Sequence, residues 1–76
     1  AGTDLAKATI GQIGLGAAGM AISRMAMNLT GHAVLGADLS QEALARFSQY
    51  GGIPSSLREI MSAADIVVAT TGVPGL

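Results

Sequence analysis

The sequence predicts an α/β fold, a parallel sheet with flanking helices in the order β-α-β-α-β-α-β. Three observations predict it. Short apolar stretches of strand length alternate with longer stretches whose apolar residues recur at helical spacing. Gly, Pro, Ser or Asp stands where one stretch gives way to the next. Strands that alternate with helices of about ten residues are typical of right-handed crossovers, which make neighbouring strands parallel.

The first strand and helix are predicted on either side of a glycine-rich stretch. The strand covers Ala8 to Ile13, which is short, partly β-branched and followed by Gly14. The helix covers Ala17 to Thr30 and ends at Gly31, which can adopt the left-handed conformation of a helix C-terminus. One face of this helix is expected to turn inward, and its residues are Ala18, Ile22, Met25, Ala26 and Leu29.

The second strand and helix follow directly. The strand is predicted over His32 to Asp38, and Ser40 is a candidate N-cap for a helix from Gln41 to Tyr50. Gly51 and Gly52 end this helix. Its inward residues are predicted to be Ala43, Leu44 and Phe47.

A short strand, a helix and a strand complete the pattern. Ile53 marks the short third strand. Ser56 and Glu59 have the Ser-x-x-Glu spacing of a capping box, which predicts a third helix from Leu57 to Ala63. Asp65 to Thr70 is a continuous apolar run after its first residue, and such runs are typical of parallel strands buried on both faces.

Composition and length limit what the chain can do. Its 76 residues form at most one small domain, residues 1–76. A doubly wound α/β domain usually has two such halves, so we expect an incomplete domain or fragment. The net charge of −1 disfavours nucleic acid and anionic membranes as partners. The sequence has no cysteine, no apolar run of membrane-spanning length and no signal peptide, so we expect a cytoplasmic protein.

Gly14, Gly16 and Gly19 fit the pattern G-x-G-x-x-G between a strand and a helix. The first glycine would permit a tight turn, the second would let a pyrophosphate approach the backbone, and the third would let the helix pack against the strand. Unpaired N–H groups at the helix N-terminus attract phosphate. The alternative is a purely structural turn. The predicted phosphate-binding residues are Gly14, Leu15, Gly16, Ala17, Ala18 and Gly19.

Asp38 ends the second strand 19 residues after Gly19. A carboxylate there can accept hydrogen bonds from the adenosine ribose and would repel a 2′-phosphate. No Arg or Lys follows until Arg46, so the sequence favours NAD over NADP. In the alternative interpretation, Asp38 only starts a turn or assists the cap at Ser40. Leu39 is included in the predicted cofactor site.

The stretch Ala69 to Leu76 follows the fourth strand, at the sheet edge where the glycine turn lies. Backbone in this stretch could line the dinucleotide, although Val-Pro-Gly is also strong turn chemistry by itself. The predicted contacts are Thr70, Thr71, Gly72 and Val73. No side chains pair an acid with a base, and none cluster as metal ligands, so we predict no catalytic or metal site in this chain.

These residues resemble the NAD-binding domain of malic enzymes (malate oxidoreductases), particularly the shorter bacterial type. The resemblance runs through "LAKATIGQIGLGAAGMAI" and "DIVVATTGVPGL" and covers nearly the whole chain. The family commonly has G-A-G-A-A-G after a strand, an acid at the end of the second strand and a loop with Gly and Pro near the nicotinamide ribose. Gly14, Gly16 to Gly19 and Asp38 match the first two features; Gly72, Pro74 and Gly75 resemble the third. Leu15 replaces the usual alanine.

The resemblance implies that the full enzyme oxidises malate with NAD and decarboxylates the product to pyruvate, assisted by Mg²⁺ or Mn²⁺. The family's catalytic residues come largely from segments ahead of the dinucleotide domain, so the isolated chain is predicted to be inactive. Its expected partners are the dinucleotide and the remainder of the parent enzyme, a homo-oligomer at full length. Two alternatives stay open: another NAD-dependent dehydrogenase, acting on amino acids or hydroxy acids, and a non-catalytic nucleotide-binding module.

Overall fold

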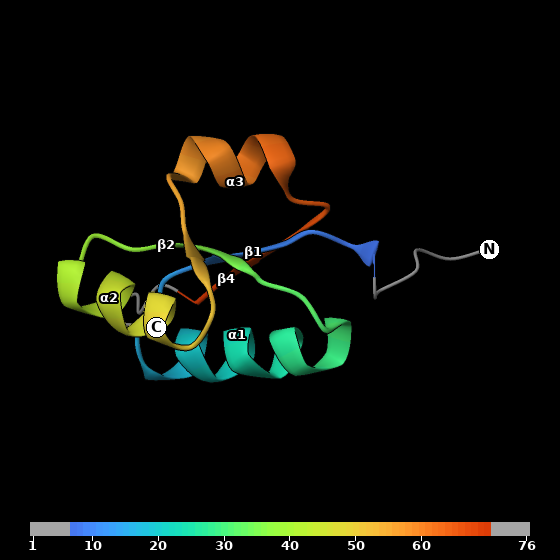
Figure 1. Cartoon of the computed structure of the whole chain (residues 1–76). Helices are drawn as coiled ribbons and strands as arrows, with labels where there is room; N and C mark the ends of the chain where they lie inside the picture. Colours follow the sequence, from blue (N-terminus) through green and yellow to red (C-terminus); the bar gives the residue numbers. More distant parts are fainter. Residues whose placement is uncertain (1–6, 71–76) are drawn as a thin grey trace.

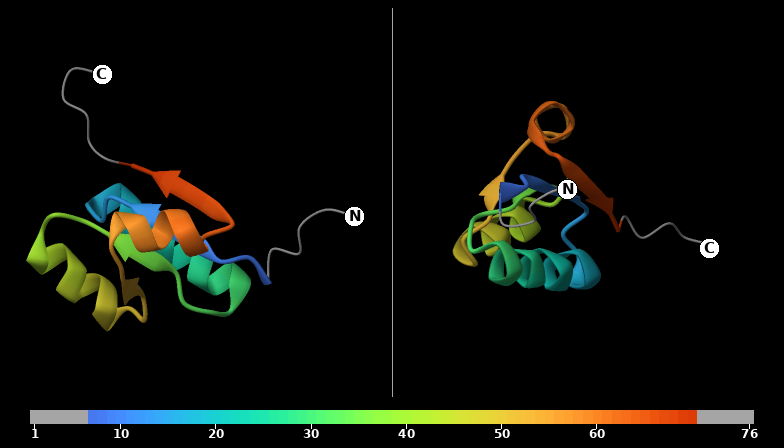
Figure 2. Two further views of the ribbon diagram at one scale, coloured as in Figure 1. Left: turned by 90° about the horizontal axis from the view of Figure 1, so that it is seen from above. Right: turned by 90° about the vertical axis from the view of Figure 1, so that its right-hand side faces the viewer.

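The computed structural model describes residues 7–70, which form a parallel sheet between two layers of helices (Figure 1). Helices α1 (Ala17–Thr30) and α2 (Gln41–Gln49) lie on one face, and α3 (Leu57–Ala63) lies alone on the other, as Figure 1 and the right-hand view in Figure 2 show. The strands are β1 (Ile10–Ile13), β2 (Leu35–Ala37), β3 (Ile53–Pro54) and β4 (Ile66–Ala69).

The strands lie in the order β3-β2-β1-β4. The chain builds outward from β1 to β3, then crosses the sheet through α3 and adds β4 on the other side of β1. The order therefore reverses between β1 and β4, which is the arrangement of a Rossmann-like fold. The predicted fold class and element order are confirmed over the described residues.

The helices match their predicted bounds closely, whereas the strands are shorter than predicted. Residues that flank the strands still take part in the hydrogen-bond ladder: the Asp65 N–H donates to the carbonyl of Thr9, and the Thr70 N–H donates to the carbonyl of Ile13. Strand ends depend on the partner strand, which periodicity does not reveal. Over residues 7–70, no helix combines the length and the apolar character that crossing a bilayer requires.

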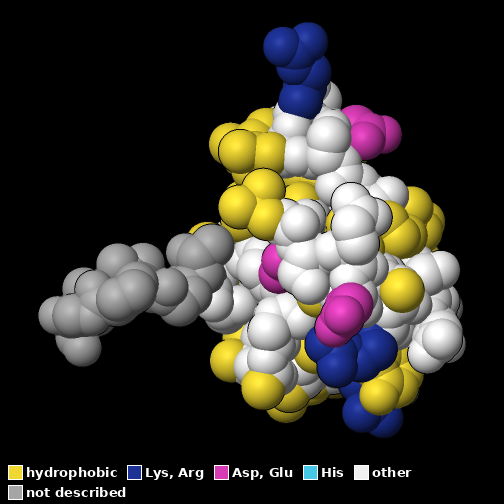
Figure 3. Space-filling model, turned by 90° about the vertical axis from the view of Figure 1, so that its left-hand side faces the viewer, with side chains coloured by type: hydrophobic (Ala, Val, Ile, Leu, Met, Phe, Trp, Pro, Cys, Tyr) yellow, Lys and Arg dark blue, Asp and Glu magenta, His cyan; other side chains and the backbone are white. Residues whose placement is uncertain are grey.

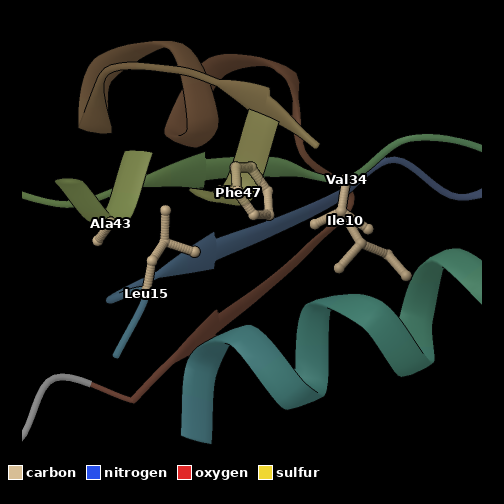
Figure 4. Close-up of a cluster of buried hydrophobic side chains, with 5 residues drawn as sticks. All are labelled: Ile10, Leu15, Val34, Ala43 and Phe47. Carbon is tan, nitrogen blue, oxygen red and sulfur yellow. The ribbon is translucent and has the colours of Figure 1, made fainter. Parts of the chain in front are cut away.

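The core lies between the sheet and the layer of α1 and α2. Figure 4 shows its five buried side chains, Ile10, Leu15, Val34, Ala43 and Phe47. The Phe47 ring occupies the space beside Gly36 and Gly52, where a Cβ atom would lie 2.4 Å from ring carbons. Ala43, Leu44 and Phe47 turn inward as predicted. The Ser40 hydroxyl accepts a hydrogen bond from the Ala43 N–H, which confirms this N-cap.

The predicted inward face of α1 is wrong in part. Met25 and Leu29 are 62% and 66% exposed, and Ala18 is also exposed. The buried residues of the helix are Gly19, Ser23 and Thr30, and Met20, Ala26 and Met27 pack against the core. Close packing of Gly19 against the end of β1 sets the rotation of the helix. The hydroxyls of Ser23 and Thr30 donate to helix carbonyls four residues earlier, so they can be buried.

The prediction that β4 is buried on both faces is also wrong. β4 lies at the edge of the described sheet, and its residues alternate between partly buried and exposed. Val67 is 40% exposed on the face that carries α3, where its register partner Gly11 packs against Ile60. The seven-residue α3 covers β1 and leaves part of β4 open.

Candidate functional site

The turn between β1 and α1 requires glycine at two of its three glycine positions. Gly14 has φ +93°, a conformation that side chains disfavour, and its N–H donates to the carbonyl of Ala37 over 2.9 Å. At Gly19, a Cβ atom would lie 1.9 Å from the Gly14 carbonyl oxygen. The structural roles predicted for Gly14 and Gly19, a tight turn and close packing of helix on strand, are therefore both present.

Gly16 stands at the N-terminus of α1 and faces open space. A Cβ atom built on it would meet no atom of the described residues within 4 Å. It is the N-cap of the helix, where no side chain caps the first turn, and Ala17 and Ala18 after it are exposed. The first turn carries no acidic residue. An exposed helix N-terminus whose approach is free of side chains can accept a phosphate group on its N–H groups.

Asp38 links the glycine turn to the start of α2. Its Oδ2 accepts a hydrogen bond from the Leu15 N–H at 2.6 Å, and its Oδ1 accepts one from the Ser40 N–H at 2.8 Å. Hydrogen bonds from the backbone of Ser40, Leu15 and Leu39 lower the pKa of this carboxyl group, against a smaller opposing effect of burial. Asp38 is therefore ionised at neutral pH. The bond from the Ser40 N–H shows that Asp38 also assists the cap of α2, as the alternative interpretation held.

That structural role leaves room for a ligand. Each carboxylate oxygen can accept a second hydrogen bond, and Asp38 is partly exposed. It lines a pocket of about 570 Å³ on the α3 side of the sheet. Gly14, Leu39 and Leu57 also line this pocket, and Ser56 opens α3 at its rim. The volume lies in the range of ligand sites, and the lining is mainly apolar, as a nucleoside requires.

A second pocket lies on the other side of the glycine turn, toward α1 and α2. It measures about 400 Å³ and contains Gly16, Ala17, Arg24, Arg46 and Tyr50 in its lining. The Arg24 guanidinium lies 4.5 Å from the centre of the Tyr50 ring. Figure 3 looks onto this end of the molecule, where acidic side chains lie near the middle of the face and basic ones gather below them. Arg24 and Arg46 come from different helices, α1 and α2, so their positions in the sequence do not show that they line one pocket.

Thr70 is the last predicted site residue that the structure describes. Its N–H donates to the Ile13 carbonyl at 2.9 Å, and its hydroxyl lies 3.3 Å from the Gly14 carbonyl oxygen, to which it donates. The end of β4 and the glycine turn are therefore adjacent, as predicted. Thr71, Gly72 and Val73 lie outside the described residues. The sequence analysis missed Gln12, a buried side chain that donates to Thr70 Oγ1 at 2.8 Å.

The described residues fit a dinucleotide and offer no metal site. An anion can approach the first turn of α1, the ionised Asp38 carboxylate lies 2.6 Å from the Leu15 nitrogen in the glycine turn, and an apolar pocket begins beside it. Within residues 7–70, no group of three or more His, Cys, Asp or Glu side chains is placed to hold a metal ion. The site offers binding and orientation, without a pair of groups for proton transfer.

Comparison with known proteins gives two matches. The family model described as the NAD-binding domain of D-isomer specific 2-hydroxyacid dehydrogenases matches residues 1–73. NAD-dependent malic enzyme 1 of Bacillus subtilis (strain 168) is 58% identical over 77 residues, which cover 100% of this chain and 18% of that protein. The resemblance to malic enzymes is therefore confirmed, with a short segment of a much longer relative. No solved structure matches the chain.

Proposed function

The chain belongs to the family of NAD-binding domains of D-isomer specific 2-hydroxyacid dehydrogenases, and on this premise we propose that it is the NAD-binding module of a malate oxidoreductase. The membership makes it a dehydrogenase module of the NAD-binding type. The choice of malate is supported by the 58% identity with a protein named as an NAD-dependent malic enzyme. Because the chain spans 18% of that relative, the reaction of the whole protein is part of the proposal.

In this proposal each part of the site binds a different part of NAD. The N–H groups of Gly16, Ala17 and Ala18 hold the pyrophosphate, because the helix N-terminus is open and Gly16 has no side chain in the way. Asp38 accepts hydrogen bonds from the adenosine ribose, and the 570 Å³ pocket beside it takes the adenine. Thr70, at the end of β4, contacts the nicotinamide side; the same role is proposed for Thr71, Gly72 and Val73, which lie outside the described residues.

When bound, NAD would supply the redox chemistry, as the acceptor of a hydride from the carbon that bears the substrate hydroxyl. The chain supplies binding and orientation. In the whole protein we propose that malate is oxidised and decarboxylated to pyruvate with Mg²⁺ or Mn²⁺, using catalytic groups outside this chain. We also propose a cytoplasmic, homo-oligomeric enzyme of which residues 1–76 are one incomplete domain.

A second candidate function has an observation of its own. The matching family is defined on D-isomer specific 2-hydroxyacid dehydrogenases, which favours simple oxidation of a 2-hydroxy acid without loss of CO₂. Assays of the whole protein with NAD and either malate or D-lactate separate the two candidate functions. Release of CO₂ from malate supports the first candidate, and turnover of D-lactate without CO₂ supports the second.

The observation that carries the cofactor proposal is the ionised Asp38 carboxylate, hydrogen-bonded to the glycine turn at the edge of an apolar pocket. Its test is the change Asp38→Asn, which removes the charge and keeps an oxygen for the Leu15 or Ser40 N–H. Charge-assisted hydrogen bonds are stronger than neutral ones, so we expect NAD to bind about tenfold more weakly. The preference for NAD over NADP should also shrink, because the repulsion of the 2′-phosphate is lost.

Isothermal titration of the 76-residue chain with NAD, NADP and AMP measures both effects. Glu42→Gln is the matched control, since it removes an exposed carboxylate from the first turn of α2 and should leave NAD affinity unchanged. Circular dichroism checks that each variant is folded. An unchanged NAD to NADP ratio in Asp38→Asn contradicts the role of Asp38. No NAD binding by the folded parent chain contradicts the cofactor proposal itself.

A further inference from the structure

Gln12 is a buried amide that the proposed function leaves unused. Only 1% of its surface is exposed, and it lies in β1, two residues before the glycine turn. It is among the largest fully buried side chains of the described residues. A side chain of this kind is rarely buried without a specific set of hydrogen bonds.

The Gln12 amide nitrogen joins two segments of chain that are distant in the sequence. Nε2 donates to Thr70 Oγ1 at 2.8 Å and to the Gly14 carbonyl at 3.1 Å, with the Ile13 carbonyl at 3.2 Å. The Thr70 hydroxyl in turn donates to the Gly14 carbonyl at 3.3 Å. Gln12, Gly14 and Thr70 therefore form a closed hydrogen-bonded group, the Gln12 triangle.

The Gln12 triangle lies where the sheet order reverses. Gly14 follows the carboxyl end of β1, and Thr70 follows the carboxyl end of β4, the two strands on either side of the reversal. Gly19, at the start of α1, is in contact with the same atoms: a Cβ there would lie 1.9 Å from Gly14 O and 2.7 Å from Thr70 Oγ1. Ligands of open α/β sheets bind just outside this point. The triangle fixes the separation of the two strand ends that flank it.

A contribution to the stability of the fold does not by itself explain why an amide side chain is buried at position 12. The Gln12 Oε1 atom is buried and accepts no hydrogen bond from the described residues. A buried acceptor without a partner is destabilising, and an apolar side chain of similar shape would avoid that cost. The nitrogen end makes specific contacts and the oxygen end makes none. The side chain therefore has a role that depends on its N–H groups.

We propose that Gln12 is a positioning residue for the dinucleotide. Through Gly14 and Thr70 it holds the glycine turn and the end of β4 at the spacing at which both can contact NAD. This inference rests on the proposed function. AMP needs only the adenosine pocket and the glycine turn. Of the triangle only Gly14 lines that pocket, and the turn there is also held by the bonds from the Gly14 N–H to the Ala37 carbonyl and from the Leu15 N–H to Asp38. The geometry therefore predicts that loss of the triangle weakens NAD and spares AMP.

The test is Gln12→Met, which keeps the length of the side chain and removes its donors. We expect the dissociation constant for NAD to rise about three- to tenfold, the range for loss of one or two hydrogen bonds, with that for AMP unchanged. Thr70→Val removes the other side of the triangle and should have the same effect. Gln49→Met, an exposed glutamine at the end of α2, is the matched control.

The titrations give distinct outcomes. A selective loss of NAD affinity in both Gln12→Met and Thr70→Val supports the inference, as does a double variant that is no weaker than either single one. Equal losses for NAD and AMP, or no loss for either, overturn it. If Gln12→Met does not fold, Gln12→Leu, which also lacks the amide donors, takes its place. If the folded parent chain binds AMP and not NAD, or neither, the proposed function fails before this inference is reached.

Discussion

Two glycines of the same turn have opposite spatial surroundings. Gly19 is buried and its missing Cβ would collide with the backbone of Gly14, whereas Gly16 is exposed and its missing Cβ would point into open space. Of these two, only Gly19 is required by the packing of the protein. The space beside Gly16 is free for a ligand. The spacing in the sequence identifies both positions and does not show this difference.

The difference predicts separate effects for two alanine substitutions. Gly19→Ala forces α1 away from β1, and overpacking of this kind costs about 1–3 kcal/mol of the free energy of unfolding. Gly16→Ala places alanine at a helix N-cap, which costs at most about 1 kcal/mol, and it obstructs the pyrophosphate. Thermal unfolding and NAD titration should show a less stable Gly19→Ala and a folded Gly16→Ala with weaker binding. Equal stability of the two variants contradicts the packing argument.

At the scale of the elements, the sequence predicts helices better than it predicts their orientation. The bounds of α1 and α3 follow from local signals, a glycine C-cap and a capping box, which act within a few residues. Which face of α1 turns inward depends on Gly19 against Gly14, a contact with another element. Counting apolar residues therefore assigned Met25 and Leu29 to the core, and the structure exposes both.

The capping box of α3 predicts a pH dependence of stability. Glu59 Oε1 accepts a hydrogen bond from the Ser56 N–H at 2.8 Å, and this bond and a second one with the Ser56 side chain lower the pKa of the Glu59 carboxyl group. A carboxyl group with a lower pKa in the folded state stabilises the protein above its unfolded pKa. That contribution is lost as the pH falls through the folded pKa. The box should therefore weaken in acid.

Thermal unfolding between pH 7 and pH 3 measures this contribution. Glu59→Gln keeps an oxygen acceptor for the box and removes the titration, so its unfolding temperature should fall less in acid than that of the parent. Ser56→Ala is the comparison: it keeps the backbone N–H, whose bond is the larger cause of the lowered pKa of Glu59, and should retain most of the acid-dependent fall. Parallel curves for the parent and Glu59→Gln count against the assignment.

At the scale of the whole molecule, one aromatic side chain closes the core. Phe47 has no exposed surface, and it lies beside Gly36 and Gly52 with the other buried side chains around it (Figure 4). The chain has one other aromatic residue, Tyr50, which is 47% exposed and contacts Arg24. Phe47 lies in α2 and Tyr50 is the C-cap of the same helix, three positions later, yet one is buried and the other is exposed.

That difference predicts unequal costs for two substitutions. Phe47→Ala should cost about 3–5 kcal/mol, a large part of the roughly 4–11 kcal/mol that a chain of this length has in total. Tyr50→Ala should cost under about 1 kcal/mol, since an exposed cation–π contact adds little. Urea unfolding of both variants measures the difference. A Phe47→Ala variant as stable as Tyr50→Ala is incompatible with the described core.

The sequence by itself determined the fold class, the helix bounds, the glycine turn and the acid at the end of the second strand. These depend on local periodicity, caps and turns, and the motif has a fixed spacing. Only the tertiary structure decided which face of α1 turns toward the core, how exposed β4 is, and the contacts of Gln12 with Gly14 and Thr70. Gln12 and Thr70 are 58 positions apart and become adjacent only when β4 pairs with β1, and no local pattern records that pairing.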